Sequence, residues 1–351
     1  MTDFEFLSQR GRTVSYRYEL LDKSDMYRRD LTTVINCTIT YDAESDLKVS
    51  ANIEMGDDQD VDYANDRIRV VCVVQCGGER REYPLWTFLL SSPARESDGT
   101  VAERNIEAYS KLQVYADDKV ESRHIVTRGT NVVNEVIRLL GVKTYRLPAS
   151  GLTLATDSEW EIGTPKLEII NGLLETINYT SLRVAADGYF EAEPYVLPAD
   201  RTVDFAYIDD GVNLLGRSVV DDFDLFSVPN VFVRYVDNPD ADPLRSVYVN
   251  DNPHSPSSTI ARGRRITSCE QVKDVADQAT LDDLTRRAAS TASQIYSSVT
   301  FTTGAMPVHG FANIIRLRHG LLDGKYEEIS WELPCLAGEL MTHTARKVVQ
   351  V

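Results

Sequence analysis

No apolar run in this 351-residue sequence approaches the roughly 20 residues that a membrane-spanning helix needs, so no membrane anchor is expected. The first residues, 1–12, carry acids early and contain no apolar segment, which is not the pattern of a secretory signal peptide. The sequence has five cysteines, an odd number without regular spacing. This pattern predicts free thiols in a reducing environment, and we expect the chain to be made in a cytoplasm.

Basic residues are scarce relative to acids. Lys and Arg number 37 against 54 Asp and Glu, which gives a formal net charge of −17. Contacts to nucleic-acid phosphates need a basic surface, so nucleic-acid binding is excluded as the main activity. An acidic wall would instead let DNA pass without adhering to it.

Motifs for catalysis or metal binding are also missing. The sequence contains neither a His-Glu-x-x-His nor a Gly-x-Ser-x-Gly segment, and its five histidines are scattered. His309 is interpreted as a loop residue. Cys72 and Cys76 share one face of an apolar strand, but no further zinc ligands lie near them, so they are interpreted as buried apolar thiols. We therefore expect no catalytic residue, no metal and no cofactor.

What the sequence does contain is β-strand patterning. The first 95 residues alternate apolar and polar side chains in closely spaced segments, and 67–76 is the most apolar of these. A barrel or sandwich would hide the edges of so many strands. Strands are expected at 13–21, 31–41, 46–55, 67–76 and 82–90.

The pattern changes to α/β after residue 95. A strand is expected at 106–116, and an apolar stripe predicts a helix that begins after Thr130 and ends at Gly141. Thr164 and Pro165 predict the start of a second helix. Asp187-Gly188 predicts a tight hairpin.

The segment 228–265 is the most unusual in the chain. Two strands, 230–236 and 246–250, are followed by a Pro- and Ser-rich run, 252–259, that predicts an extended arm able to reach a neighbouring subunit. A long helix is expected at 280–299. Three strands are expected after it, at 311–318, 325–333 and 341–349.

Several segments of the chain form a set of structural motifs. They are Val228-Pro229-Asn230, 247–253 (VYVNDNP), 255–258 (SPSS), 263–266 (GRRI), 160–167 (WEIGTPKL) with 170–174 (INGLL), 187–190 (DGYF) with 193–195 (EPY), and 18–21 (YELL) with 34–39 (VINCTI). Together they resemble the tail hub proteins of long-tailed bacteriophages and related tail-like particles, and the resemblance covers most of the chain.

The resemblance implies an α+β, mainly β fold. It would contain two small barrels like those of tail-tube proteins, with an α/β insertion domain between them. The first barrel is expected at 1–95, completed by about 200–230. The α/β domain would span 96–199, and the second barrel, with the helix 280–299, would span 230–351.

The resemblance also implies a function. Such hubs form homotrimers that close the tail tube and connect a distal tail protein ring, the tape-measure protein and a spike or fibre protein. DNA passes through the lumen without specific binding. The chain would then be a structural protein of the virion tail, at the tail tip or baseplate, made in the host cytoplasm and without enzymatic activity.

Two groups of residues are candidates for such roles. The basic cluster could pair with an acidic neighbour, since arginine forks match carboxylates, although it could equally be a polar strand end. The acidic group could line the lumen, bind calcium, or form an ordinary solvated surface, which is the simplest interpretation. The expected subunit contacts are Asn252, Pro253, Ser255, Pro256, Arg262, Arg264 and Arg265, and the expected lumen residues are Asp204, Asp209, Asp210, Asp221, Asp222 and Asp224.

Two alternatives stay open at this point. A phage-associated cell-wall hydrolase would need paired acids or a metal motif, and the sequence shows neither. A receptor- or carbohydrate-binding tail protein would be expected to expose clustered aromatic residues, whereas the 17 tyrosines are spread through strands.

Overall fold

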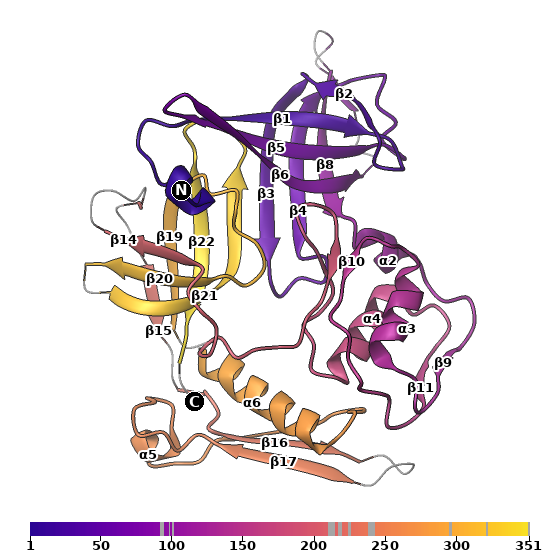
Figure 1. The fold of residues 1–351 in the computed structure, drawn as a ribbon, viewed down its shortest axis with the longest axis vertical. Coiled ribbons are helices and arrows are strands. Elements are labelled where there is room, and N and C mark those ends of the chain that lie inside the picture. The colour runs from indigo at the N-terminus through magenta and orange to yellow at the C-terminus, as the bar shows by residue number, and fades with distance from the viewer. Residues whose placement is uncertain are drawn as a thin grey trace.

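The large sheet of this mainly β protein holds 14 strands and is open at both ends within the described part of the chain. The computed structural model describes all residues except 92–94, 98, 100–101, 210–214, 217–219, 224–225, 238–242, 295–296, 321 and 350–351. Figure 1 shows the sheet in two halves, with an α/β unit beside one and a helix-covered hairpin below the other.

The N-terminal half of the sheet comes from the first 110 residues. Its strands alternate buried and exposed side chains, as period-two patterning requires, and β5 has the bounds predicted for the most apolar strand. The strands are β1 (Thr13–Leu21), β2 (Tyr27–Leu31), β3 (Val34–Asp42), β4 (Val49–Gly56), β5 (Arg67–Cys76), β6 (Glu79–Leu90), β7 (Arg95–Ser97) and β8 (Ala102–Ser110).

The C-terminal half is built from later strands. β3 pairs antiparallel with β21, from Asp42 opposite Ser330 to Thr38 opposite Pro334, and this pairing joins the two halves into one sheet. The strands are β14 (Phe205–Ile208), β15 (Val220–Phe223), β19 (Ser297–Gly304), β20 (Ile314–His319), β21 (Leu322–Pro334) and β22 (Leu340–Lys347). Eleven of the 14 strands follow the order β15-β19-β22-β21-β3-β4-β8-β6-β5-β1-β2, and β7, β14 and β20 pair beside this path.

The strands between 200 and 230 do not complete the N-terminal half. β14 pairs in parallel with β20, and β15 pairs antiparallel with β19, so both add to the C-terminal half. The expected pairing with residues 1–95 is therefore wrong. β8 extends the N-terminal half beyond residue 95, since it pairs with β4 and β6.

The α/β unit contains three helices and small sheets. Asn131 caps the middle helix by accepting a hydrogen bond from the Asn134 N–H, so the cap is one residue later than expected. Gly141 ends that helix with φ of 62°, a left-handed conformation that favours glycine. The elements are α2 (Gln113–Asp117), β9 (His124–Val126), α3 (Val132–Leu140), β10 (Tyr145–Arg146), β11 (Ser158–Trp160), α4 (Lys166–Glu175), β12 (Arg183–Val184) and β13 (Phe190–Glu191).

The hairpin unit lies apart from the large sheet. Its strand order is β17-β16-β18, and helix α6 covers it (Figure 1). Val236, Val275 and Leu281 form part of a small separate core there. The elements are β16 (Val231–Val236), β17 (Leu244–Val249), α5 (Thr259–Arg262), β18 (Thr267–Gln271) and α6 (Gln278–Gln294).

A short first helix, α1 (Asp3–Leu7), packs against the C-terminal half. Thr2 and Glu5 form its capping box, and the Phe4 ring meets the rings of Phe205 and Tyr207. The main core runs through both halves of the sheet and into the α/β unit. None of the described helices combines the length and the apolar character that crossing a membrane requires.

Candidate functional site

The large sheet has one apolar face and one polar face, and the polar face crosses the junction between its halves. In β3, Cys37, Ile39 and Tyr41 are buried, whereas the alternate residues Thr38 and Thr40 point to the other side. The polar face is formed by the outward side chains of six adjacent strands: Ser298, Thr300, Thr302, Thr342, Thr344, Arg346, Ser330, Glu332, Asn36, Thr38, Thr40, Asp42, Ser50, Asn52, Glu54, Asn105, Glu107 and Tyr109.

Strand register places these side chains in continuous rows. One row runs from Thr342 through Glu332, Thr40 and Ser50 to Tyr109, which spans five strands of both halves. The Cβ atoms of directly opposite residues in an antiparallel pair lie about 5 Å apart, so each row is a contiguous surface.

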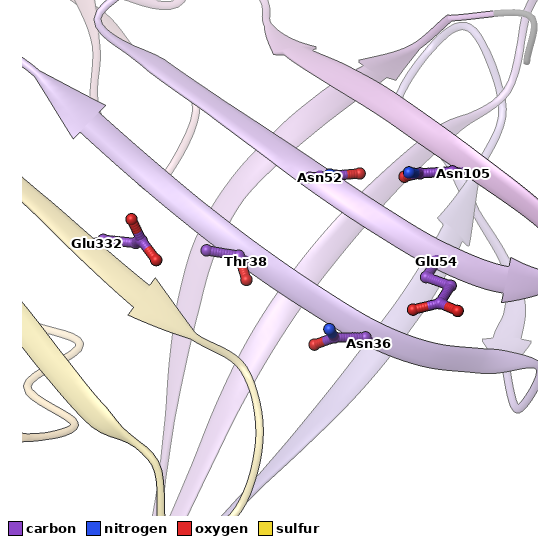
Figure 2. A pocket seen from close by; sticks show the side chains of 6 residues that line it. All are labelled: Asn36, Thr38, Asn52, Glu54, Asn105 and Glu332. Atoms are coloured by element: carbon purple, nitrogen blue, oxygen red, sulfur yellow. The ribbon is translucent and has the colours of Figure 1, made fainter.

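A shallow hollow of about 290 Å³ lies on the polar face. Figure 2 shows its lining side chains, which come from β3, β4, β8 and β21 and carry amide, hydroxyl and carboxylate groups. They are Asn36, Thr38, Asn52, Glu54, Asn105 and Glu332.

The charge of the polar face is negative. Asp42, Glu54, Glu107 and Glu332 contribute carboxylates. The basic residue of the polar face is Arg346, and its guanidinium pairs with the Glu44 carboxylate at 2.7 Å. The carboxylates of this surface repel phosphate groups, and its hydroxyls and amides are donors without positive charge.

Comparison with known proteins gives a result at the level of structure. No family model matches the sequence, and no curated protein matches it. The tail protein from Neisseria meningitidis MC58 aligns with a TM-score of 0.66 over 95% of this chain and 96% of its own, at 12% identity. The chain has the fold of a phage tail protein.

Two further structures agree. The 43 kDa tail protein of prophage MuSo2 from Shewanella oneidensis aligns with a TM-score of 0.61 over 94% of this chain and 98% of its own, at 12% identity. The prophage tail protein gp18 from Listeria monocytogenes EGD-e aligns with a TM-score of 0.59 over 94% of both chains, also at 12% identity. The shared architecture covers nearly the full length in each case.

The prediction of an extended arm at 252–259 is wrong, because residues 250–263 fold into a compact loop. The Asn250 side chain donates to the Ser255 and Ser257 hydroxyls at 2.9 and 3.2 Å, and all three residues are buried. Ser258 then caps the short helix α5. Of the expected contact residues here, Ser255 is buried, Asn252 is half-buried, and Pro253 and Pro256 are exposed.

The arginines of the basic cluster differ in their contacts. Arg262 donates to the carbonyls of Val228 and Phe226 at 2.8 and 2.7 Å. Arg264 donates to the Phe226 carbonyl at 2.9 Å and lies over the Phe226 ring. Both arginines therefore hold the entry to β16 within the chain, while Arg265 is exposed. Their role in subunit contact stays a prediction.

The acidic group is only partly described. The Asp204 carboxylate accepts from the Ile314 N–H at 2.7 Å, and Asp209 lies at the far end of β14, 3.9 Å from His319. Asp221 and Asp222 lie in β15, opposite Val299 and Ser298 of β19. Asp210 and Asp224 lie outside the described residues. Asp204 thus fixes the β14–β20 pairing, and a lumen role for the group stays a prediction.

A buried polar cluster under the C-terminal half was missed by the sequence interpretation. The Glu328 carboxylate lies between two histidines, 2.7 Å from His309 Nδ1 and 2.6 Å from His343 Nδ1. The outer ring nitrogens meet hydroxyls: His309 Nε2 lies 2.7 Å from Tyr207 Oη, and His343 Nε2 lies 2.8 Å from Thr303 Oγ1. A bulge in β21 between Glu328 and Ser330 turns Glu328 into the core.

These three residues are the group in the described structure that could hold a metal ion, with ligand atoms within 4.8 Å of one another. The N–O distances favour hydrogen bonds, since two ligands of one tetrahedral zinc lie about 3.3 Å apart. Burial lowers the pKa of His309 to about 3 and lowers that of His343. Burial raises the pKa of Glu328, and the hydrogen bond from His343 opposes that shift. The cluster is a buried hydrogen-bond network that links β14, β19, β21 and β22.

Proposed function

We propose that this chain is the structural hub of a phage tail tip or baseplate, or of a phage-tail-like particle, and that it acts as a homotrimeric ring. The observation that carries the proposal is the polar face. It runs without interruption across both halves of the sheet, so each subunit presents a single polar wall. A protein that encloses a passage for DNA needs such a wall.

In this proposal each half of the sheet corresponds to one tail-tube-like barrel. Three subunits then supply six such units around one axis, which gives a threefold ring a nearly sixfold wall. The β3–β21 pairing supports this arrangement, because it holds the two halves in one sheet. The fold shared with phage tail proteins supports it as well.

The polar face is proposed to line the lumen. Glu332 lies on β21, at the junction of the two halves, and Glu54 and Glu107 lie on β4 and β8. Their charge would repel DNA phosphates and keep the DNA from adhering. The wall is thus assigned to β3, β4, β8 and β21, in addition to the acids of 204–224 named from the sequence.

The ring would connect a distal tail protein ring, the tape-measure protein and a spike or fibre protein in the virion tail. We assign no catalytic step to this chain. His309, Glu328 and His343 resemble a catalytic constellation, but their side chains are 0% exposed and a substrate could not reach them. A zymogram on cell-wall material tests this part, and clearing by the purified chain would contradict it.

Light scattering of the purified protein tests the ring. We expect a concentration-dependent species of three times the 39.4 kDa chain mass. Electron microscopy of that species should show rings with an open centre. A monomer at every concentration, with no ring formed when a hexameric distal tail protein is added, would overturn the proposal.

A further inference from the structure

Two cysteines meet at the end of the strand pair that joins the two halves of the sheet. Cys37 lies in β3, and Cys335 is the first residue after β21. The register ends with Pro334 opposite Thr38, so the next opposite pair is Cys335 and Cys37. The Cys335 N–H donates to the Cys37 carbonyl at 2.7 Å, which extends the ladder by one residue.

The backbone spacing at this position suits a disulfide. Hydrogen-bonded residues that lie opposite each other in an antiparallel pair have Cα atoms about 5.5 Å apart. A disulfide accepts Cα separations of about 4.4–6.8 Å, most often near 5.5–6 Å. Directly opposite residues at this spacing therefore meet the Cα requirement of a disulfide.

Both side chains also point to the same side of the sheet. The flanking inward pair, Leu333 opposite Ile39, is buried in the main core. Cys37 and Cys335 are 0% and 3% exposed and belong to the same core. Burial raises the pKa of Cys335, and the neighbouring Cys37 thiol adds to that shift, which agrees with two thiols in mutual contact.

The position of the pair gives it a structural consequence. Among the strand pairs of the described residues, β3–β21 is the one that connects β1–β8 with the C-terminal strands. A covalent bond between residues 37 and 335 would keep this connection closed. It would also link positions far apart in sequence, where a cross-link restricts the unfolded chain most.

We propose that Cys37 and Cys335 form a disulfide that locks the two halves of the sheet together when the protein meets a peroxide. The Cys37 thiolate attacks one oxygen of hydrogen peroxide, which breaks the O–O bond, gives a sulfenic acid and releases hydroxide. The Cys335 sulfur attacks the sulfenic sulfur, the S–S bond forms, and water leaves. In total, two thiols and one peroxide give one disulfide and two waters.

The same geometry makes the reaction slow and selective. Burial raises the pKa of Cys335, so this thiol supplies little thiolate for the second step at neutral pH. A core position admits peroxide more readily than a bulky disulfide reagent. The chain would fold and assemble in the reduced state and be locked afterwards, in an oxidising medium. This chemistry does not depend on the proposed function, so failure of the trimer would leave it intact.

The test uses the full chain with Cys269→Ser, since Cys269 is exposed and would form bonds between molecules. The protein is treated with hydrogen peroxide, unfolded, alkylated and digested without reductant. We expect the free thiols to fall from four to two, and mass spectrometry to find one linked peptide pair that contains residues 37 and 335. The oxidised form should melt at a higher temperature than the reduced form, and reductant should reverse the difference.

Cys37→Ala removes one partner of the proposed disulfide, and Cys72→Ala is its matched control, because Cys37 and Cys72 are both buried. Cys37→Ala should remove both the linked peptide and the rise in melting temperature, whereas Cys72→Ala should retain them. Four alkylatable thiols after long exposure to peroxide would overturn the proposal. So would a linked pair that contains Cys72 in place of Cys37. The peptide map of the Cys269→Ser protein decides the matter even if Cys37→Ala fails to fold.

Discussion

Glu328 is a fully buried carboxylate whose cost of burial is offset by the two histidine Nδ1 atoms at 2.6 and 2.7 Å. A buried ionisable group left without partners destabilises a fold by several kcal/mol, so this cluster is a sensitive point of the core. It also connects elements distant in sequence, because Tyr207 in β14 and Thr303 in β19 hold its two ends.

The histidines of this cluster make stability depend on pH. An ordinary histidine binds a proton near pH 6.5, whereas burial lowers the pKa of His309 to about 3. The unfolded chain therefore binds more protons between these values, and stability is lost as the pH falls from about 6.5 toward 3. We expect His309→Gln to reduce this slope, by at most about 1.4 kcal/mol per pH unit, in urea denaturation at a series of pH values.

Glu328 acts in the opposite direction. Its pKa is raised, so its contribution is present at low pH and is lost as the pH rises through the folded-state pKa. His309→Gln also removes a hydrogen-bond partner of Glu328, so the slope below pH 6.5, where the two contributions differ in sign, is the quantity to compare. His254→Gln is the control, because His254 is exposed. Equal slopes in the wild type and His309→Gln would contradict this account.

At the scale of elements, the loop 250–263 depends on one asparagine outside it. The Asn230 side chain donates to the carbonyls of Ser257 and Arg264 at 3.2 and 2.9 Å, and its oxygen accepts from the Ile266 N–H at 2.8 Å. Asn230 is 0% exposed, so these backbone groups have no ready access to water in its place. The loop is thus tied to the start of β16.

Asn230→Ala should release this loop. Leaving buried backbone groups unpaired costs about 1–3 kcal/mol, and we expect a loss of that size in the free energy of unfolding, with faster proteolysis within 250–263. His254→Ala, in the same loop but exposed, should change neither quantity. Unchanged proteolysis in Asn230→Ala would show that the hydrogen bonds do not hold the loop.

Local signals in the sequence predicted several elements correctly. The apolar run 67–76 is β5, Gly141 ends α3 in the left-handed conformation, and Gly188 forms the expected turn with φ of 87°. Each depends on side chains within a few residues. Alternation also marked the polar positions of β3 and β4, although only the strand order shows that they form one surface.

Features that depend on distant contacts could not be predicted. The partners of β14 and β15 are set by β20 and β19, about 80 to 110 residues later. Glu328 reaches both His309 and His343 because the β21 bulge turns it into the core, and a bulge has no clear sequence signal here. The prolines and serines of 252–259 disfavour a helix or strand, which predicts an extended arm. In the structure Ser255 and Ser257 instead bond to each other and to Asn250 in a compact loop.

At the scale of the whole molecule, the continuity of the polar face determines what the ring can do. A wall that carries Glu54 and Glu332 at the junction of the two halves should repel DNA at every subunit. Reversing those charges would place basic side chains around the hollow in Figure 2, three times over in a trimer. The same chain should then retain the polymer that it is proposed to let pass.

We expect Glu54→Lys/Glu332→Lys to bind duplex DNA in a mobility-shift assay at low salt, where the wild type binds none, with affinity that falls steeply as salt increases. Glu121→Lys/Glu161→Lys is the matched control: it makes the same change in net charge at two exposed positions of the α/β unit. If the wall is the polar face, only the first pair should retain DNA, and light scattering should show the same oligomer in both. Equal retention by both pairs would mean that net charge alone governs the effect, and the polar face would lose its assignment as the lumen wall.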